Sequence, residues 1–89
     1  MYHYHGTLVI EKPICLRECA KILLLAEQTN CEIKFISKNK EGTNASIMSL
    51  LKLEMKPNDV VALFITSHND DESNEQLALN SLHKILAKN

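Results

Sequence analysis

The sequence predicts an α+β fold in which helices pack on one face of a four-stranded antiparallel sheet. Three short segments are rich in apolar and β-branched residues, and a hairpin turn after the second of them predicts a short, weak fourth strand. Two longer segments repeat apolar residues at helical spacing. Strands with one solvated face and helices with one apolar face pack most simply as two layers. We expect seven elements in this order: a strand (2–10), a helix (16–27), a strand (31–37), a short strand (40–43), a short helix (44–55), a strand (60–66) and a final helix that ends near Ala87.

The first strand and the first helix are separated by Pro13. Residues 2–10 alternate in character and end in a run of β-formers, which predicts a strand. The helix that follows is expected to bury residues spaced i, i+3, i+4, i+7 and i+8 on one face. These residues are Leu16, Cys19, Ala20, Leu23 and Leu24.

The middle of the chain predicts a hairpin. In "CEIKFIS", Cys31, Ile33 and Phe35 alternate with polar residues, which predicts a strand with one solvated face. The segment "KNKEGT" has turn formers and a glycine, so a tight turn into a short strand is expected.

The second half of the chain predicts a short helix, a strand and a longer helix. In "NASIMSLLKLEM" four apolar residues fall within about two turns, and Asn44 or Ser46 is placed to cap the helix. The apolar run "VVALFIT" predicts a central strand. The last helix has acids before its start and lysines near its end, as the helix dipole favours. Its expected apolar face is Ala78, Leu82, Ile85 and Leu86.

Length and composition exclude several classes of protein. The 89 residues are interpreted as one domain, residues 1–89. A net charge of -1 gives no overall attraction for nucleic acid or an anionic membrane. The chain has no apolar run of membrane-spanning length and no signal-peptide pattern, so we expect a cytoplasmic location. The three cysteines lack zinc-ligand spacing and are interpreted as thiols, and we expect no metal and no cofactor.

Two strings resemble segments of HPr, the histidine-containing phosphocarrier of the sugar phosphotransferase system. The string "SIMSLLKL", residues 46–53, is similar to the family's regulatory serine and the short helix that it opens. The string "PICLRECA", residues 13–20, is similar to the family's active-site segment. The resemblance covers the whole chain, nearly without gaps. It implies an open-faced β-sandwich, βαββαβα, with sheet order 1-4-2-3.

The resemblance also assigns positions at the start of the first helix. It places Ile14 at the family's leucine and Arg17 at its phosphate-binding arginine. Cys15 then stands at the position of the phosphorylated histidine, and Glu18 stands where the family has proline. The histidines present are elsewhere, at His3, His5, His68 and His83.

This replacement changes the chemistry of the helix start. An imidazole nitrogen takes phosphate as a phosphoramidate, and a helix start and an arginine hold that phosphate meanwhile. A thiol at Cys15 does not reproduce that geometry, although thiolates carry phosphate in other proteins of the same transport system. The carboxylate of Glu18 would repel an incoming phosphoryl group.

Ser46 is the candidate modification site. A phosphate at a helix start meets the helix dipole and free N–H groups. The resemblance implies that Arg17 and a neighbouring apolar patch of Ile47, Met48 and Leu51 then bind partner proteins. The simpler interpretation makes Ser46 an ordinary helix cap and the apolar residues part of the core.

The remaining candidates are weaker. A helix start and Arg17 favour a reactive thiolate at Cys15, whereas the simpler interpretation is a small residue tolerated there. Cys19 lies one turn further on, and core packing explains it better than a metal site with Cys15. His3 and His5 share one strand face, which is more often solvated than metal-binding. The acidic "HNDDES" is interpreted as a helix start rather than a calcium loop.

The sequence therefore predicts a non-enzymatic regulatory protein, similar to the catabolite-repression HPr-like proteins. An HPr-type serine kinase/phosphorylase would modify Ser46, and the modified protein would bind a transcriptional regulator or a metabolic enzyme. One alternative is a phosphoryl-transfer protein that uses Cys15. Another is a thiol-based sensor or a degenerate paralogue.

Overall fold

The computed structural model describes residues 3–68 and 72–87, which form four strands and three helices. The predicted order of elements is confirmed, and the bounds of the predicted segments shift by a few residues, since the first helix continues past Glu27 to Thr29. The elements are β1 (His3–Val9), α1 (Leu16–Thr29), β2 (Cys31–Ser37), β3 (Lys40–Thr43), α2 (Ile47–Leu51), β4 (Val60–Ser67) and α3 (Glu72–Leu86).

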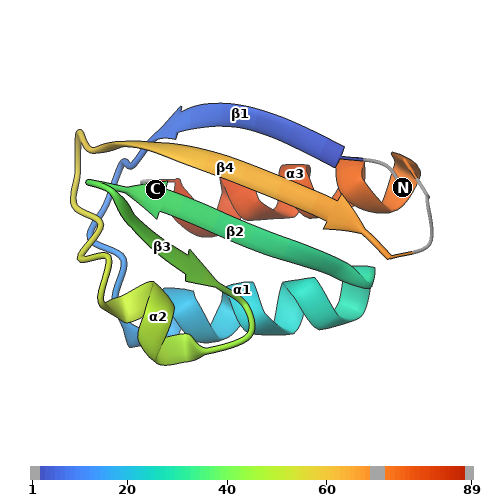
Figure 1. The fold of residues 1–89 in the computed structure, drawn as a ribbon, viewed down its shortest axis with the longest axis horizontal. Helices are drawn as coiled ribbons and strands as arrows, with labels where there is room; N and C mark the ends of the chain where they lie inside the picture. Colours follow the sequence, from blue (N-terminus) through green and yellow to red (C-terminus); the bar gives the residue numbers. More distant parts are fainter. Residues whose placement is uncertain (1–2, 69–71, 88–89) are drawn as a thin grey trace.

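The four strands form one antiparallel sheet in the order β1-β4-β2-β3. This is the order that the resemblance implied, and β4 is central as its apolar run predicted. In Figure 1, α1 and α3 lie behind the sheet, and α2 lies beside β3 and the start of α1. The opposite face of the sheet is open, so the fold is the expected open-faced sandwich.

The core lies between the sheet and the helices. Alternate residues of the two central strands face it and are almost fully buried, which explains the alternation seen in the sequence. Burying each of these side chains contributes about 1.5–3 kcal/mol. They are Ile33 and Phe35 of β2, and Val61, Leu63 and Ile65 of β4.

The buried face of α1 differs from the predicted one. Leu16 and Leu24 are exposed at 59% and 54%, and Ala20 is exposed too, so this part of the prediction was wrong. The helix offers two apolar stripes, and periodicity does not choose between them. The predicted stripe meets the charged Glu27 in the last turns, whereas the observed stripe stays uncharged along the helix. It consists of Cys19, Ile22, Leu25, Ala26 and Thr29.

Two left-handed turns set the ends of β2. Asn30 ends α1 with φ 54° and donates its N–H to the carbonyls of the last turn, as helix C-caps commonly do. Lys38 and Asn39 have φ 54° and 65°, the conformation of a two-residue hairpin turn that matches strand twist. The predicted hairpin is confirmed.

Gly42 in β3 allows α2 to approach the sheet closely. A Cβ atom at this position would lie 2.7 Å from the Ser49 carbonyl oxygen and 2.9 Å from Leu53 Cδ1. Real Cβ atoms do not approach backbone so closely, so only glycine fits without moving α2. The position of α2 therefore depends on a missing side chain in the neighbouring strand.

Within residues 3–68 and 72–87, no helix is both long and apolar enough to cross a membrane.

Candidate functional site

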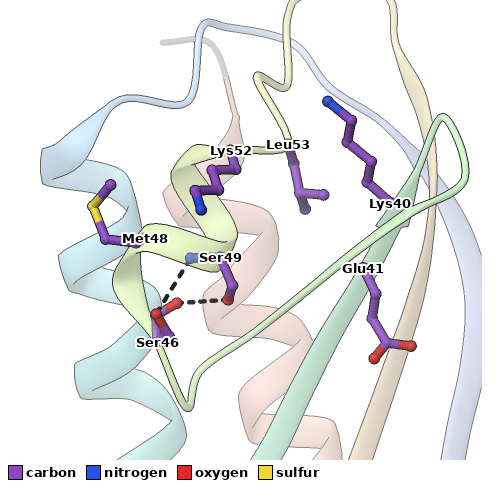
Figure 2. Close-up of a pocket in the computed structure, with 7 residues that line it drawn as sticks. All are labelled: Lys40, Glu41, Ser46, Met48, Ser49, Lys52 and Leu53. Carbon is purple, nitrogen blue, oxygen red and sulfur yellow. Dashed lines mark hydrogen bonds between the residues drawn. The ribbon is translucent and has the colours of Figure 1, made fainter.

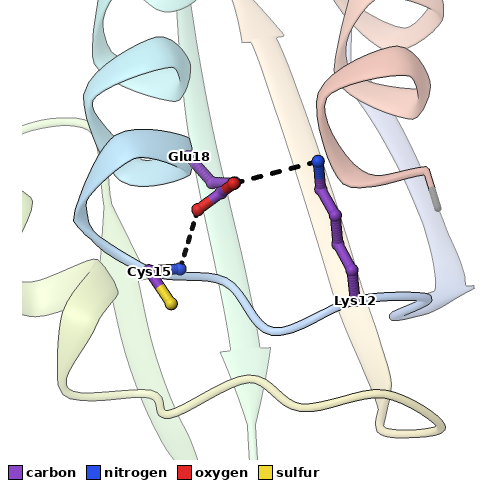
Figure 3. A network of polar contacts seen from close by, with 3 residues as sticks. All are labelled: Lys12, Cys15 and Glu18. Atoms are coloured by element: carbon purple, nitrogen blue, oxygen red, sulfur yellow. Dashed lines mark hydrogen bonds and ion pairs between the residues drawn. The ribbon is translucent and has the colours of Figure 1, made fainter. Parts of the chain in front are cut away.

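The start of α1 is capped by a carboxylate from its own first turn. Cys15 is the N-cap residue, with extended backbone (φ -102°, ψ -171°), and its side chain is exposed. The Cys15 backbone N–H donates a hydrogen bond of 3.0 Å to Glu18 Oε1. Lys12 Nζ lies 3.8 Å from the other oxygen of the same carboxylate. Figure 3 shows these contacts, with the Cys15 sulfur pointing away from the carboxylate.

These contacts keep the Glu18 carboxyl ionised. The hydrogen bond from the Cys15 N–H is the main cause that lowers the pKa of Glu18, and the charges of Lys12 and Arg17 lower it further. An anion at a helix start is favoured by the dipole and by the free N–H groups. The place where a helix start would hold a phosphate oxygen is therefore partly taken by the protein's own carboxylate.

The segment before α1 is tied to the segment after α2. The Ile14 N–H donates to the Met55 carbonyl at 3.2 Å. Ile10 donates to the Asp59 carbonyl at 2.8 Å and accepts from the Asn58 N–H at 2.7 Å. Because α1 and α2 also pack against each other, the two helix starts have fixed relative positions.

Ser46 is the N-cap residue of α2, as predicted. Its Oγ accepts a hydrogen bond of 3.4 Å from the Ser49 N–H, and its side chain is exposed. The Ser49 hydroxyl lies 2.7 Å from the Ser46 carbonyl oxygen and also bonds the backbone of Thr43. Figure 2 shows both contacts between the two serines. The hydroxyl of Ser49 therefore holds the turn that presents Ser46.

A shallow cavity of about 400 Å³ lies beside α2, between that helix and β3. Ser46 and Met48 line it, together with the basic side chains of Lys40 and Lys52 (Figure 2). Sequence reasoning missed the two lysines, since only the fold brings a hairpin residue and a residue after α2 to the same place. Glu41, Ser49 and Leu53 complete the lining.

The predicted apolar patch is divided between surface and core. Met48 is 55% exposed and is available to a partner. Ile47 and Leu51 are half-buried and pack against the core. Arg17 is exposed in the first turn of α1, the helix against which α2 packs. The structure thus brings the predicted patch and the first helix start to one side of the molecule (Figure 1).

The other candidate thiols and histidines have structural roles. Cys19 is fully buried, and burial raises the pKa of its thiol, so the prediction of core packing is confirmed. Cys31 is buried too. His5 stacks on the Phe64 ring with centroids 4.3 Å apart, and His3 Nδ1 lies 3.0 Å from Thr66 Oγ1.

No group of three metal-ligating side chains occurs in the described part of the chain. The acidic "HNDDES" segment falls partly on residues 69–71, which lie outside the described residues.

A buried carboxylate, that of Glu75, lies in the first turn of α3. Glu75 is 2% exposed, and its Oε2 accepts a hydrogen bond of 3.3 Å from the Ser67 N–H. Its Oε1 has no hydrogen-bond partner among residues 3–68 and 72–87. Burial is the main cause that raises the pKa of Glu75, opposite to the effect at Glu18. Nothing in the sequence distinguished this glutamate from exposed acids.

The fold and the two neighbouring helix starts indicate a class of protein, the small open-faced β-sandwiches. In this class the start of the first helix favours an anion, and a hydroxyl caps the second helix. A family model described as "PTS HPr component phosphorylation site" matches residues 7–88. The chain belongs to the HPr family, the phosphocarriers of the phosphotransferase system. Proteins of this family carry phosphate and are not catalysts in the usual sense.

Solved structures of similar fold agree. HPr from Bacillus anthracis str. Ames has a TM-score of 0.75 at 15% identity, over 98% of this chain and 100% of that one. HPr-C-His from Thermoanaerobacter tengcongensis has a TM-score of 0.73 at 18% identity, over 97% and 98%. A histidine-containing phosphocarrier protein of Mycoplasma has a TM-score of 0.72 at 15% identity, over 97% and 100%. No curated protein matches the chain significantly.

Proposed function

We propose that this chain is a non-catalytic, regulatory member of the HPr family that is phosphorylated at Ser46 and acts by binding other proteins. The modifying enzyme would be an HPr-type serine kinase/phosphorylase. The bound partner would be a transcriptional regulator or a metabolic enzyme of carbon catabolite control.

The observation that carries the proposal is the cap on α1. If Cys15 stands at the family's phosphohistidine position, no imidazole is available there to carry phosphate. The Cys15 N–H already binds the Glu18 carboxylate at 3.0 Å, and Lys12 is paired with the same group. An incoming phosphoryl group would meet a negative charge and would have to displace this contact. Both features weigh against a carrier function at the first helix.

The surroundings of Ser46 support modification there. Its side chain is exposed, and its hydroxyl accepts only a long hydrogen bond of 3.4 Å. A phosphate adds about two negative charges at neutral pH. Lys40 and Lys52 line the same cavity as Ser46 and would offset part of that charge. The cavity beside Ser46 thus has two lysines and one acid, Glu41, in its lining, whereas the residue that binds the Cys15 N–H is the acid Glu18.

Exposed groups near Ser46 support a protein-binding surface. The Met48 side chain supplies a flexible apolar contact, since it is unbranched and more than half exposed. Ile47 and Leu51 extend this contact with their exposed portions. Arg17 adds a positive charge to this surface. Among the described residues no carboxylate forms a close ion pair with it, although its charge helps to lower the pKa of Glu18. A partner with an apolar centre and an acidic rim fits this surface.

The test is an intact-mass measurement after incubation with ATP and an HPr-type serine kinase. We expect one added phosphate, which Ser46→Ala abolishes. Ser81→Ala is the control, because it removes a serine hydroxyl from α3, away from the turn that presents Ser46, and should leave the phosphate in place. Phosphate that persists in Ser46→Ala, or no phosphate in the wild type, would contradict the proposal.

A second candidate rests on the exposed thiol of Cys15. Phosphoenolpyruvate with the first enzyme of the phosphotransferase system would then label the wild-type chain, and Cys15→Ala would not be labelled. Fast reaction of Cys15 with a thiol reagent, without any labelling, would instead favour a thiol-based sensor.

A further inference from the structure

Another cavity, of about 340 Å³, lies at the end of α1 away from Cys15 and has no part in the proposed function. Residues from the last turns of α1, the start of β2, the segment before α2 and the segment after β4 line it. In Figure 1, the end of α1, the start of β2 and the end of β4 meet at the right of the molecule, while α2 lies at the left. The lining is mixed in character, since it joins apolar side chains to amide, imidazole and carboxylate groups.

The end of α1 that borders this cavity carries a negative charge that the described chain does not balance. Glu27 lies in the last turn of α1, which contains no basic residue. The C-terminal end of a helix is itself partly negative, so cations are favoured there and acids are not. The last turn of the other long helix, α3, follows this rule with His83 and Lys84. The carboxylate of Glu27 is exposed and has no ion pair or hydrogen bond with residues 3–68 or 72–87.

The rest of the lining adds no opposing charge. With histidine counted as neutral at pH 7, Glu27 is the one charged residue among the described residues that line the cavity. An anion would therefore meet a carboxylate and no lysine or arginine. Residues 3–68 and 72–87 also contain no group of three His, Cys, Asp or Glu side chains placed to hold a metal ion. The charge and the spacing of the lining together favour an organic cation.

The uncharged polar groups of the lining are planar, and their backbones are held in place. Asn44 Oδ1 accepts the Ile33 N–H at 2.8 Å, and the Asn44 N–H donates to the Ile33 carbonyl at 3.1 Å. The Asn30 carbonyl accepts the His68 N–H at 3.1 Å. Two carboxamides and one imidazole therefore border the cavity at positions that are fixed before any ligand enters, which reduces the entropic cost of binding.

We infer that this cavity binds a guanidinium group, with the Glu27 carboxylate as its counter-ion. A guanidinium group is planar, presents its N–H donors in a fork that matches a carboxylate, and stacks on other planar groups. The Asn30 carboxamide makes no hydrogen bond with residues 3–68 or 72–87, so its oxygen is available to accept a further N–H. The alkyl stem of the ligand would lie against the apolar side chains of Leu23 and Ala26.

A primary ammonium group fits the same cavity less well. It is a compact, strongly hydrated charge without a planar surface, so it would use the carboxylate and leave the planar groups unused. The guanidinium can belong to a small molecule such as arginine or to an arginine side chain of another protein, and both present the same chemistry to Glu27. The inference does not rest on the proposed function, because it requires no phosphate at Ser46.

The test is a titration followed by backbone amide NMR at constant ionic strength, with ethylguanidinium as the probe. We expect a Kd on the order of millimolar, with the largest shifts at Asn30, Cys31 and His68. Ethylurea is the matched neutral probe, since it has a similar planar shape without the charge. It should bind on the order of tenfold more weakly.

Two variants locate the charge that the probe recognises. Glu27→Gln keeps the shape of the side chain and removes its charge, so it should weaken ethylguanidinium binding on the order of tenfold. Glu54→Gln is the matched control, because Glu54 is an exposed glutamate that does not line this cavity, and binding should be unchanged. Glu27→Gln should also unfold at the wild-type temperature or higher, since it removes an unfavourable charge from the helix end.

Several results would overturn the inference. They are no amide shift up to about 50 mM ethylguanidinium, shifts centred outside the cavity, or equal weakening in the two variants. Binding of ethylurea or propylammonium as tight as that of ethylguanidinium would do the same. Free arginine and N-acetylarginine amide then distinguish the two sources. Tighter binding of free arginine supports a small-molecule site, and tighter binding of the amide supports a site for a protein side chain.

Discussion

The first turns of α1 and α2 lie on the same side of the molecule and are capped in opposite ways. At α1, the Glu18 carboxylate binds the backbone of Cys15 and pairs with Lys12. At α2, the neutral hydroxyl of Ser46 makes one long hydrogen bond beside two lysines. The first start therefore already holds an anion, while the second has an uncharged cap beside a cavity lined by two lysines and Glu41. The comparison shows that two helix starts on one side of a small fold can be capped by a charged and by a neutral side chain.

Gly42→Ala should have the largest effect on this comparison. The added Cβ would meet the Ser49 carbonyl and Leu53, so α2 must shift, at a cost of about 1–3 kcal/mol in the free energy of unfolding. Urea unfolding measures this cost. Amide NMR shifts should change more at the start of α2 than at the start of α1, which packs against α2. A loss below about 0.5 kcal/mol would show that α2 is not held against the sheet.

Glu18→Ala should have the next largest effect. It removes the cap of α1 and the ion pair with Lys12, so we expect a loss of about 1 kcal/mol. Glu18→Gln is the matched control, because an amide oxygen can still accept the Cys15 N–H. The glutamine variant should lose less stability than the alanine variant in the same denaturant titration. Equal losses of stability in the two variants would show that Glu18 stabilises the chain through its charge and not through its hydrogen bond to Cys15.

Ser46→Ala should cost less than Glu18→Ala. The hydrogen bond from the Ser49 N–H is 3.4 Å long, so we expect about 0.5 kcal/mol, the low end for an N-cap serine. Thermal unfolding followed by circular dichroism measures the difference. A larger loss than at Glu18 would reverse the comparison between the two helix starts.

The smallest expected effect is on the pH dependence of stability. The pKa of Glu18 is lowered in the folded chain, so its contribution is present above the ordinary glutamate value of about 4.3 and is lost as pH falls through the lower folded pKa. The pKa of Glu75 is raised, so folding is favoured at acid pH and this advantage is lost as pH rises through the raised value.

Two glutamine variants separate these opposite slopes. Unfolding free energies measured at a series of pH values should show a weaker loss of stability in acid for Glu18→Gln. For Glu75→Gln they should show a weaker loss on the way from acid to neutral pH. The same change of slope in both variants would contradict the assignment of opposite pKa shifts.

The sequence was sufficient for most of the fold. Alternation in β2 and the apolar run of β4 are local patterns, and the structure confirms both strands and the short helix between them. The buried face of α1 was not predictable, because two apolar stripes compete and only the packing against the sheet selects one. That is why Leu16 and Leu24 were expected in the core and lie on the surface.

The candidate site was predictable only where its residues are neighbours in sequence. Ser46 as a cap and Met48 as an exposed contact follow from one short string. The presence of Lys40 in the same cavity as Ser46 depends on the β2–β3 hairpin, and the burial of Glu75 depends on its contact with the end of β4. Glu18 was expected to repel phosphate, and the structure adds that it binds the backbone N–H of Cys15.

The hydrogen bonds from Ile10 and Ile14 to residues 55–59 have a practical consequence for labelling the protein. A fluorophore or peptide tag inserted after Pro57 would pull apart the two segments that carry the helix starts. The exposed hairpin tip is tied to the same segment by an ion pair, with Lys38 Nζ 3.6 Å from Asp59 Oδ2, so a reporter placed at Asn39 with Lys38 retained is the better choice.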